Sequence, residues 1–512
     1  MKRWRWQILV GLICLPVALL ASGFGLSWFG EPKGRALALP VPSGDEEIAW
    51  LHTTTGTNTW ERFVFGIVRT QMQVPGLHVD DSAAFQDSTT AVPEIVLWKE
   101  GSPGKLRIRW YKIRSDAAET EWVNALAERS PAPLAVIGGG STDRAVELAK
   151  ALEARTQWRG DRPAFLITTA TADRVAPAEN PLGSSPLLVD LYDDRSFRFC
   201  FSNRQMADAV LDFVDQNPEL KPQLFSDTAR GAVASGLSVA LPNTAWKPSV
   251  FSVQWNDDPY STDLHEQFKE SLLENASPDA LGEHPFQFSR WDIPFSIGGF
   301  NRANTYESRT GESIAKQVFE LPPQRSLLIL PAVTQPARRL LNAVVEAYSD
   351  ARRRLIVVTG DGIPVNAMLR DGEFAWPMAQ LGVPLVFFTH ANPVGWDPPS
   401  GMAPPGYALA PPNSTEEASH FAEMGRIIVE VCFPADSSEL VNRGDRVIAN
   451  LHALKPAFFN RNGERLGGTG EYVVVSLPRY RVTADAIEVW RRKSDGKWRW
   501  IDTVSPAAGG QR

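Results

Sequence analysis

The feature that most constrains this fold is a repeated alternation of short apolar runs with segments of helical period. The runs in "PLAVIGGGSTDR", "RPAFLITTATADRV", "RSLLILPAVTQ" and "RRRLIVVTGDGIP" are apolar without a break, not at every second residue. An unbroken apolar strand is buried on both faces, and strands that alternate with helices form a parallel sheet with right-handed crossovers. The 512 residues hold too many such units for one sheet of usual size. We therefore predict an α/β protein of two lobes, each with a parallel sheet.

The predicted division of the chain follows from these units and from the regions between them. Residues 1–30 are predicted as a signal anchor or signal peptide, and residues 31–45, which contain Pro and Gly, as a linker. The predicted lobes are residues 46–193 with about 400–455, and residues 194–399 with about 456–505. The end of the second lobe contains an "SDGK" turn between two apolar segments and is predicted as antiparallel strands.

The N-terminus indicates export. Lys2, Arg3 and Arg5 precede a stretch from Ile8 to Phe29 that carries no charged residue. A secretory apolar region is usually ~7–15 residues, whereas a membrane span needs ~20, and this stretch is nearer the second. Basic residues before such a stretch favour a cytoplasmic N-terminus. We predict an extracytoplasmic, periplasmic-type body that is tethered to the membrane, with a signal peptide cleaved after Gly23 as the open alternative.

Charge and cysteine content exclude two classes of protein. The formal net charge is -7, which gives no basic face for nucleic acid. Cys200 and Cys432 lie far apart in sequence and match no metal motif. They could pair in an oxidising compartment, but two separate buried thiols are our prediction. The 17 Trp residues are predicted to serve packing in the core and between the lobes.

Catalytic signatures are absent from the sequence. Gly138–Gly140 is followed by Ser-Thr without the Lys of a phosphate-binding loop, and there is no G-x-G-x-x-G after a strand, no nucleophile elbow and no H-E-x-x-H. The seven His residues are scattered and indicate no metal pair. We predict a protein that is not an enzyme and that needs no cofactor and no metal.

Several strands instead end in turns of small hydroxyl residues or glycine. Ser141 and Thr142 open a helix, whose free N–H groups and dipole attract an anion. In open α/β sheets, ligands bind outside the carboxyl ends of the strands. Hydroxyls and amides suit a carboxylate, and an Asp opposite suits an ammonium group. The competing interpretation is plain helix capping by Ser and Thr. The other turns hold Thr53, Thr54, Thr55, Thr57, Thr168, Thr169, Thr171 and Asp361.

Taken in order, four segments resemble one family. "VIGGGSTDRAVELAKALE", "FLITTATADRV", "FRFCFSNRQMADAVLDFV" and "VQWNDDPYSTDLHEQF" are similar to the type I periplasmic binding proteins, the receptors of branched-chain amino acids and amides. The resemblance spans about residues 46 to 400. It implies two Rossmann-like lobes joined by a hinge of several chain crossings, which close on a small ligand. The extra segment "PELKPQLFSDTARGAVASGLSVALPNTAWKP" and the long tail depart from the family.

The resemblance also implies roles for individual residues. Ser141 and Thr142 match the turn that holds a carboxylate, and Thr169 and Thr171 match a second hydroxyl turn. "LHTTTGTNT", with Thr55, resembles the loop after the first strand of the family. The residues implied for the second lobe are Asp361, which would meet an ammonium group, and Tyr260, an aromatic beside the hinge.

The function expected from the residues and the resemblance together is that of a solute-binding receptor of the ABC-transport or sensing type. Its ligand would be a small amino-acid-like or amide compound in the cleft between the lobes, and its partner a membrane permease or sensor. The alternative is a membrane-tethered interaction or scaffold module that keeps the fold without a small ligand. An enzyme on a two-lobed frame is the third interpretation.

Overall fold

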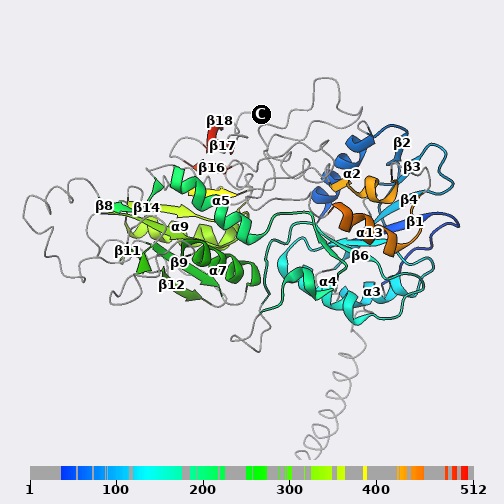
Figure 1. Ribbon diagram of the computed structural model, residues 1–512, viewed down its shortest axis with the longest axis horizontal. Helices are drawn as coiled ribbons and strands as arrows, with labels where there is room; N and C mark the ends of the chain where they lie inside the picture. The colour runs from blue at the N-terminus through cyan, green and yellow to red at the C-terminus, as the bar shows by residue number, and fades with distance from the viewer. Residues whose placement is uncertain are drawn as a thin grey trace, which may run out of the picture.

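The structure is a computed structural model in which two α/β bodies lie side by side (Figure 1). It describes residues 36–53, 56–71, 74–86, 88, 90–114, 119–175, 185–192, 194–216, 220–224, 250–255, 258–273, 287–288, 294–295, 297–302, 316, 324–348, 354–363, 385–388, 424–425, 427–434, 440–454, 479–482, 487–492 and 498–504.

The first lobe is built on a sheet of seven strands in the order β2-β3-β4-β1-β5-β6-β7. The pairs from β4 to β7 are parallel, as the unbroken apolar runs predict, while β2 and β3 add an antiparallel edge. The strands are β1 (Glu46–Thr53), β2 (Leu77–Asp80), β3 (Glu94–Lys99), β4 (Leu106–Ile113), β5 (Ala135–Gly138), β6 (Ala164–Ile167) and β7 (Ser196–Arg198).

Helices cover both faces of this sheet, which is why its central strands are apolar throughout (Figure 1). Along β1, Ile48 and Trp50 join the core beneath α2 (Thr57–Gln71) and α13 (Gly444–Leu454). Ala49 and Leu51 point the other way, into the core beneath α3 (Glu119–Ala127) and α4 (Thr142–Ala154). This alternation follows from the two-residue period of a strand.

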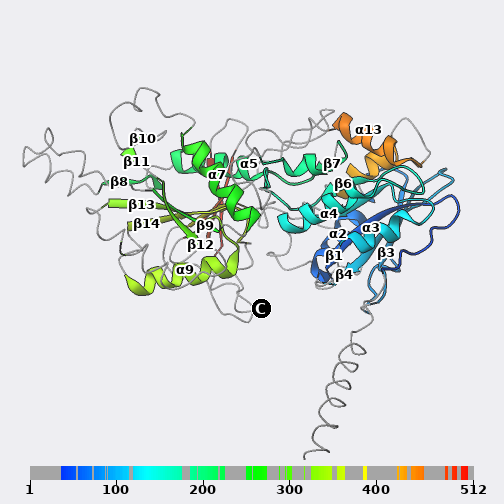
Figure 2. The same ribbon diagram turned by 90° about the horizontal axis from the view of Figure 1, so that it is seen from below.

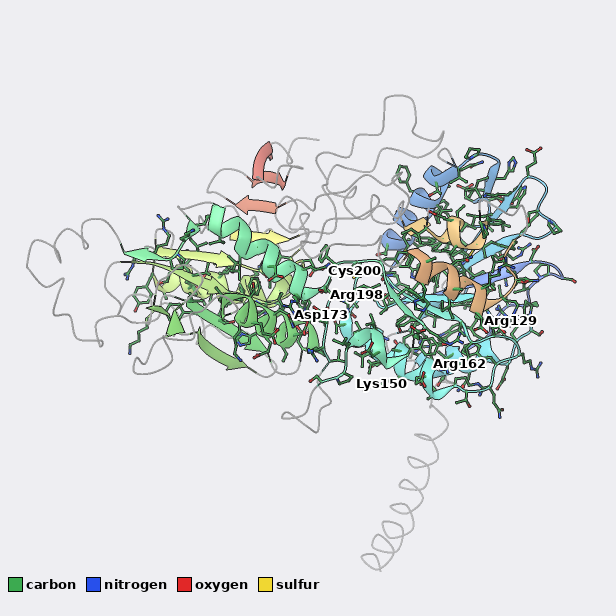
Figure 3. The ribbon with its side chains drawn as sticks, in the orientation of Figure 1. Arg129, Lys150, Arg162, Asp173, Arg198 and Cys200 are labelled. Carbon is green, nitrogen blue, oxygen red and sulfur yellow. The ribbon has the colours of Figure 1, made fainter. Side chains whose placement is uncertain are left out.

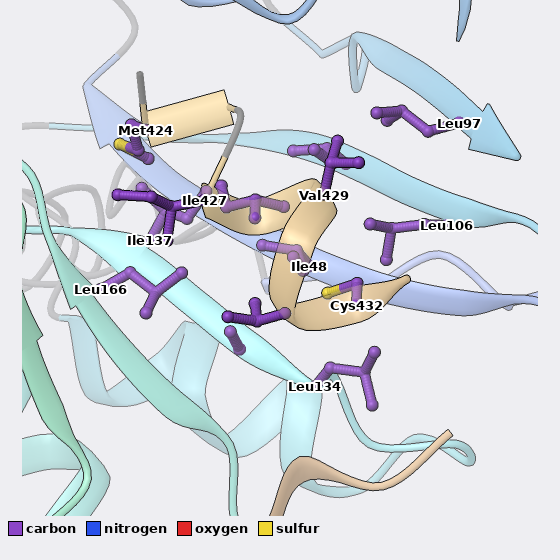
Figure 4. Packing of buried hydrophobic residues seen from close by; sticks show 14 of the residues in the cluster. Ile48, Leu97, Leu106, Leu134, Ile137, Leu166, Met424, Ile427, Val429 and Cys432 are labelled. Carbon is purple, nitrogen blue, oxygen red and sulfur yellow. The ribbon is translucent and has the colours of Figure 1, made fainter. Parts of the chain in front are cut away.

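A late segment of the chain completes the first core. Residues 427–432 are helical, and Figure 4 shows Ile427, Val429 and Cys432 packed beside Ile48. The sequence predicts that residues from about 400 to 455 return to the first lobe, and the described residues of that range do pack there.

The second lobe contains a nine-stranded sheet in the order β12-β9-β13-β14-β15-β16-β17-β18, with β8 paired to β13. The strands from β12 to β15 are parallel, and β15 to β18 are antiparallel. Its members are β8 (Gln223–Leu224), β9 (Val250–Trp255), β12 (Ile297–Arg302), β13 (Gln324–Ile329), β14 (Leu355–Val358), β15 (Leu385–Phe388), β16 (Arg479–Val482), β17 (Ile487–Arg492) and β18 (Trp498–Val504). β10 (Gln287–Phe288) and β11 (Pro294–Phe295) form a separate antiparallel pair.

Helices lie on both faces of the second sheet, as they do in the first lobe. Helices α5 (Asn203–Gln216) and α7 (Pro259–Leu273) share a core with Leu327 and Ile329 of β13. Helix α9 (Thr334–Ala347) lies on the opposite side (Figure 2). A short 3-10 helix, η1 (Leu188–Leu191), packs on the first lobe against α4.

The chain passes from the first lobe to the second at Cys200. Phe199 belongs to the first core and Phe201 to the second. The predicted boundary after residue 193 is therefore a few residues early, because β7 (196–198) still pairs with β6 in the first sheet.

The segment predicted as a linker, residues 31–45, is fixed to the first lobe from Ala38 onward. Ala38 and Leu39 pack against the core beneath α3 and α4, and the backbone N–H of Leu39 donates to the Tyr111 hydroxyl at 3.3 Å. Arg109 and Arg129 donate to the carbonyls of Pro40 and Leu39 at 3.0 and 3.1 Å. Buried arginines need such acceptors, so this stretch serves as part of the lobe.

Two expectations concern compartment and thiols. The uncharged stretch Ile8–Phe29 lies outside the described residues, and among the described helices none is both long and apolar enough to cross a membrane. Cys200 and Cys432 are buried, separate free thiols, which confirms the prediction. Burial raises the pKa of each thiol to about 12, so both are inert at neutral pH.

Candidate functional site

A pocket of about 190 Å³ opens at the carboxyl ends of β1, β4 and β5. β1 lies between β4 and β5, and the helix after β1 covers one face of the sheet while those after β4 and β5 cover the other. Open α/β sheets form their ligand crevice at such a change of side. The lining residues are Leu51, His52, Thr53, Ile113, Glu119, Gly139, Gly140, Ser141, Arg144 and Leu148.

The turn from Gly138 to Ser141 forms one wall of the pocket because only glycine fits there. Gly139 has a φ of +72°, and a Cβ on it would lie 3.0 Å from the Ala145 Cβ. A Cβ on Gly138 would lie 2.5 Å from Leu148. The missing side chains let α4 close onto β5 and β6.

Ser141 stands at the N-cap of α4 in an extended conformation, but its side chain makes no capping hydrogen bond. Its side chain is exposed at the pocket. Its position and free hydroxyl argue against plain capping at this turn and leave the Oγ able to meet a ligand.

His52 forms another wall. Its ring stacks on buried Trp50 with centroids 5.2 Å apart and an interplanar angle of 9°. A Cβ on Gly140 would come 3.3 Å from the imidazole Cε1, so the glycine turn also makes room for this ring. No motif in the sequence indicates His52; the nearest signal is its place at the end of the first apolar strand, beside the Thr/Gly loop.

Glu119 and Arg144 supply the charges of the pocket. The Arg144 Nη1 donates to the Glu119 Oε1 at 2.6 Å, and the two side chains are 27% and 5% exposed. The hydrogen bond to Glu119 raises the pKa of Arg144. A hydrogen bond with Glu119, with burial next, raises the pKa of the neighbouring Glu147. Glu119 and Arg144 could not be predicted from the sequence, because they lie on different helices and share no motif.

Of the predicted threonines, Thr53 lines the pocket, whereas Thr142, Thr169 and Thr171 lie beside the wall and outside the lining. Thr169 donates its hydroxyl to the Gly140 carbonyl at 3.1 Å, which joins the two predicted turns. Thr142 and Thr171 are 4% and 1% exposed. The Thr171 carbonyl accepts from the Asn203 backbone N–H at 2.7 Å and from Arg198 at 3.2 Å. The Thr171 segment is therefore closed over by the start of α5, and Thr55 lies outside the described residues.

The same segment carries the contact between the lobes. Asp263 of α7 accepts the backbone N–H groups of Asp173 and Arg174 at 2.8 and 3.0 Å. It also accepts the side-chain amide of Asn203 at 2.9 Å. Figure 3 shows Asp173, Arg198 and Cys200 together where the two bodies meet. This polar contact is buried, since Asp263 is 5% exposed.

Asp361 and Tyr260 lie together in the second lobe. The Gly362 N–H donates to the Tyr260 hydroxyl at 2.9 Å. Burial first, and then the charge of Asp361, raise the pKa of Tyr260 well above its usual range. Asp361 is half-buried, and its charge also raises the pKa of Cys200 at the crossing. Asp361 therefore interacts with Tyr260 of its own lobe and, through its charge, with Cys200 at the crossing between the lobes.

The turn that carries Asp361 tolerates no side chain at Gly360. A Cβ there would lie 2.7 Å from the Tyr260 hydroxyl and 2.8 Å from Leu264. We expect Gly360→Ala to lower the free energy of unfolding by about 1–3 kcal/mol through overpacking, as measured by urea titration. Adding Tyr260→Phe removes the nearest atom and should recover part of the loss. An unchanged midpoint for Gly360→Ala would show that the turn is not closely packed.

Metal chemistry finds no support in the described residues, where no cluster of His, Cys, Asp and Glu could hold an ion.

Comparisons with known proteins find distant structural likeness only. No family model and no curated protein matches the chain. An ABC transporter substrate-binding protein from Desulfitobacterium hafniense is 13% identical, with 89% of this chain and 100% of that chain covered and a TM-score of 0.47. An R. palustris solute-binding protein in complex with 4-hydroxybenzoate is 11% identical, with 90% and 97% covered and a TM-score of 0.48.

A fatty acid ABC transporter substrate-binding protein from Thermomonospora curvata is 10% identical, with 94% and 97% covered and a TM-score of 0.46. At these identities and TM-scores, no ligand, activity or partner is carried over from the three proteins to this chain.

Proposed function

We propose that this chain is an extracytoplasmic solute-binding receptor without catalytic activity, and that it binds a small amino-acid-like or amide ligand. The observation that carries the proposal is the pocket at the change of side in the first sheet, with the uncapped Ser141 hydroxyl at its wall. A ligand carboxylate or amide oxygen would accept from Ser141 and from backbone N–H groups of its turn.

The two-lobed frame supports this proposal by its mechanics. The lobes meet through a crossing at Cys200 and through the Asp263 contact. A ligand that touches both lobes would shift the population of their arrangements, as a receptor requires. The membrane tether and the permease or sensor partner belong to the same proposal. The tether rests on the N-terminal sequence, and the partner rests on the resemblance of the four segments to the binding-protein family.

A thermal-shift screen with amino acids, their amides and short amides tests the proposal. A ligand at 100 times its Kd should add ~2.7 kcal/mol to the free energy of unfolding. Ser141→Ala should reduce the shift while the ligand-free protein keeps its Tm, because no capping hydrogen bond is lost. Ser88→Ala, at an exposed serine outside the pocket, is the matched control.

If a ligand shifts the Tm of the wild type and of Ser141→Ala by the same amount, that ligand does not bind in this pocket. If no compound of the screen stabilises the wild type, the receptor proposal fails. The interaction or scaffold module would then be the better interpretation.

A further inference from the structure

We propose that Asp263 and Asp173 form a reciprocal latch that holds the two lobes in the arrangement of this structure. In such a latch, each lobe supplies a carboxylate that accepts backbone N–H groups of the other lobe. Neither acid lines the pocket. The latch therefore acts on the lobes at a place of its own, and it does not depend on which ligand the pocket takes.

The second lobe supplies the first acid. Asp263 of α7 accepts the backbone N–H groups of Asp173 and Arg174 at 2.8 and 3.0 Å. These two residues precede Val175, which is buried in the core beneath α3 and α4. Leu264, next to Asp263, is buried in the core of the second lobe. One carboxylate thus holds together two segments that are rooted in different cores.

The first lobe supplies the second acid. The Asp173 Oδ2 accepts the backbone N–H of Arg204 at 3.0 Å, in the first turn of α5. The N–H groups at the start of a helix have no partner within the helix, and a carboxylate beside them is favourable. Asp173 therefore does for a helix of the second lobe what Asp263 does for the segment after β6.

Asn203 and Arg198 join the two halves of the latch. Both donate to the Thr171 carbonyl, the Asn203 backbone N–H at 2.7 Å and the Arg198 Nη1 at 3.2 Å. The Asn203 side-chain amide also donates to Asp263 at 2.9 Å. Arg198 donates to Asp173 at 3.2 Å, where the two bodies meet (Figure 3). Because both bridging residues meet at one carbonyl, displacement of either acid should disturb the other.

Burial makes the hydrogen bonds of the latch open together. Asn203 is 0% and Asp263 is 5% exposed. Removal of the Asp263 carboxylate would take the acceptor from two backbone N–H groups and from the Asn203 amide. A buried donor that loses its acceptor keeps the cost of its desolvation. Water must then reach these donors, and the contact opens as a whole.

The latch constrains the lobes more tightly than a chain crossing does. The crossing at Cys200 is a stretch of backbone whose φ and ψ angles can rotate. The latch binds the segment after β6 to α7 and to α5 at the same time, and α4 of the first lobe also contacts α7. We expect one populated arrangement in the wild type and a wider range once the latch is broken.

The distance between two spin labels on the full chain tests this expectation. Glu61→Cys on α2 and Glu346→Cys on α9 provide exposed positions, on the faces of the two sheets away from α4 and α7 (Figure 2). Cys200 and Cys432 are buried, and Cys14→Ser removes the third cysteine of the chain. Pulsed dipolar spectroscopy of this labelled protein should give one narrow distance population.

Asp263→Ala and Asp173→Ala break the latch from opposite lobes, and each should widen the distance distribution or add a second population. The Asp173 side chain is 25% exposed, so its variant keeps the test decisive if Asp263→Ala folds poorly. Asp208→Ala is the matched control, because its carboxylate accepts from Ser271 at 2.6 Å within the second lobe. This control should leave the distribution unchanged.

Hydrogen exchange distinguishes a latch from two local bonds. Asp263→Ala leaves the acceptor of the Arg204 N–H in place, and Asp173→Ala leaves the acceptor of the N–H groups at 173 and 174 in place. In a latch, each variant should nonetheless speed exchange in the other half by at least about tenfold, the usual value of one hydrogen bond to a charged group. Mass spectrometry of peptides that cover 171–175 and 202–206 measures both halves.

Three results would overturn the inference. A wild-type distribution as wide as that of Asp263→Ala means that the lobes are not latched. Narrow distributions in both variants mean that other contacts hold the lobes. Faster exchange only at the N–H groups whose own acceptor is removed means that the two halves are independent. None of these results bears on the receptor proposal, which the thermal-shift screen decides.

Discussion

Glu47→Gln is expected to lower the free energy of unfolding by about 3–5 kcal/mol, the usual result of breaking a buried ion pair. Glu47 is 0% exposed and accepts from Arg109 Nη1 at 2.8 Å and Arg129 Nη1 at 2.7 Å. The Tyr111 hydroxyl donates to it at 3.2 Å. Arg109 keeps a second carboxylate in Glu94. Among the described residues, Glu47 is the one carboxylate in an ion pair with Arg129, so the variant leaves a buried guanidinium without a directly paired carboxylate.

The measurement is urea unfolding followed by tryptophan fluorescence, since Trp50, Trp60 and Trp110 report on this lobe. Glu153→Gln is the matched control, because its ion pair with Arg162 is 46% exposed at the carboxylate and should contribute less than about 1 kcal/mol. Adding Arg129→Met to Glu47→Gln removes the stranded charge and should recover much of the loss. A cost for Glu47→Gln no larger than that for Glu153→Gln would contradict the argument.

The ion pairs of Glu47 with Arg109 and Arg129 lie at the opposite end of the first sheet from the pocket. They lie at the amino ends of the parallel strands and anchor Leu39 and Pro40, while the pocket lies at the carboxyl ends of the same strands. Charge at the first end therefore serves stability, and the ion pair at the second end lines the pocket of the proposed receptor.

The parts of the fold that sequence predicted are those fixed by local pattern. Apolar runs such as Ala135–Gly138 became central parallel strands, because burial on both faces demands that composition. The return of a late segment to the first lobe and the antiparallel tail were also predicted. The antiparallel strands β2 and β3 carried no such signal for their place in the sheet, since sheet order depends on contacts distant in sequence.

The site was less accessible from sequence for the same reason. The Ser141 turn is a local feature and could be found, but Glu119, Arg144 and His52 meet only through the packing of α3, α4 and β1. Thr171 was expected to be accessible because it follows a strand. Its burial depends on Arg198 at the end of β7 and on Asn203 at the start of α5, which are distant from it in sequence. The sequence of a hydroxyl-rich turn shows that hydrogen-bond donors are present. It does not show whether another helix or strand covers them in the folded protein.

The second large effect concerns the contact between the lobes. Asp263→Asn is expected to gain stability relative to the wild type as pH rises from about 4 to about 7. Burial, and then the negative charge of Asp173, raise the pKa of Asp263 from 3.8 to about 6. Hydrogen bonds from Asp173, Arg174 and Asn203 act in the opposite direction but do not outweigh burial.

The sign follows from linkage. An acid whose pKa is raised by folding contributes stability that is complete below its unfolded pKa and is lost as pH rises through its folded pKa. For Asp263 this window runs from about pH 4 to about pH 6. A shift of about two units corresponds to about 3 kcal/mol. Asparagine stays neutral throughout, so the difference in unfolding free energy between variant and wild type should move by that amount in favour of the variant.

Urea unfolding of both proteins at pH 4, 5, 6 and 7 measures this difference, and the titrating groups that do not interact with Asp263 cancel in it. The charged groups that face Asp263 remain in both proteins: Asp173 stays paired with Arg198 at 3.2 Å, and the Arg174 guanidinium donates to the Ser185 carbonyl. Asp263→Ala separates charge from hydrogen bonding, because it strips the acceptor from the N–H groups of 173 and 174 at every pH. A difference between Asp263→Asn and wild type that stays flat from pH 4 to 7 would mean that the carboxylate is stabilised as well between the lobes as in water. The contact would then hold the lobes together at neutral pH without an electrostatic cost, because its buried donors would balance the loss of solvent.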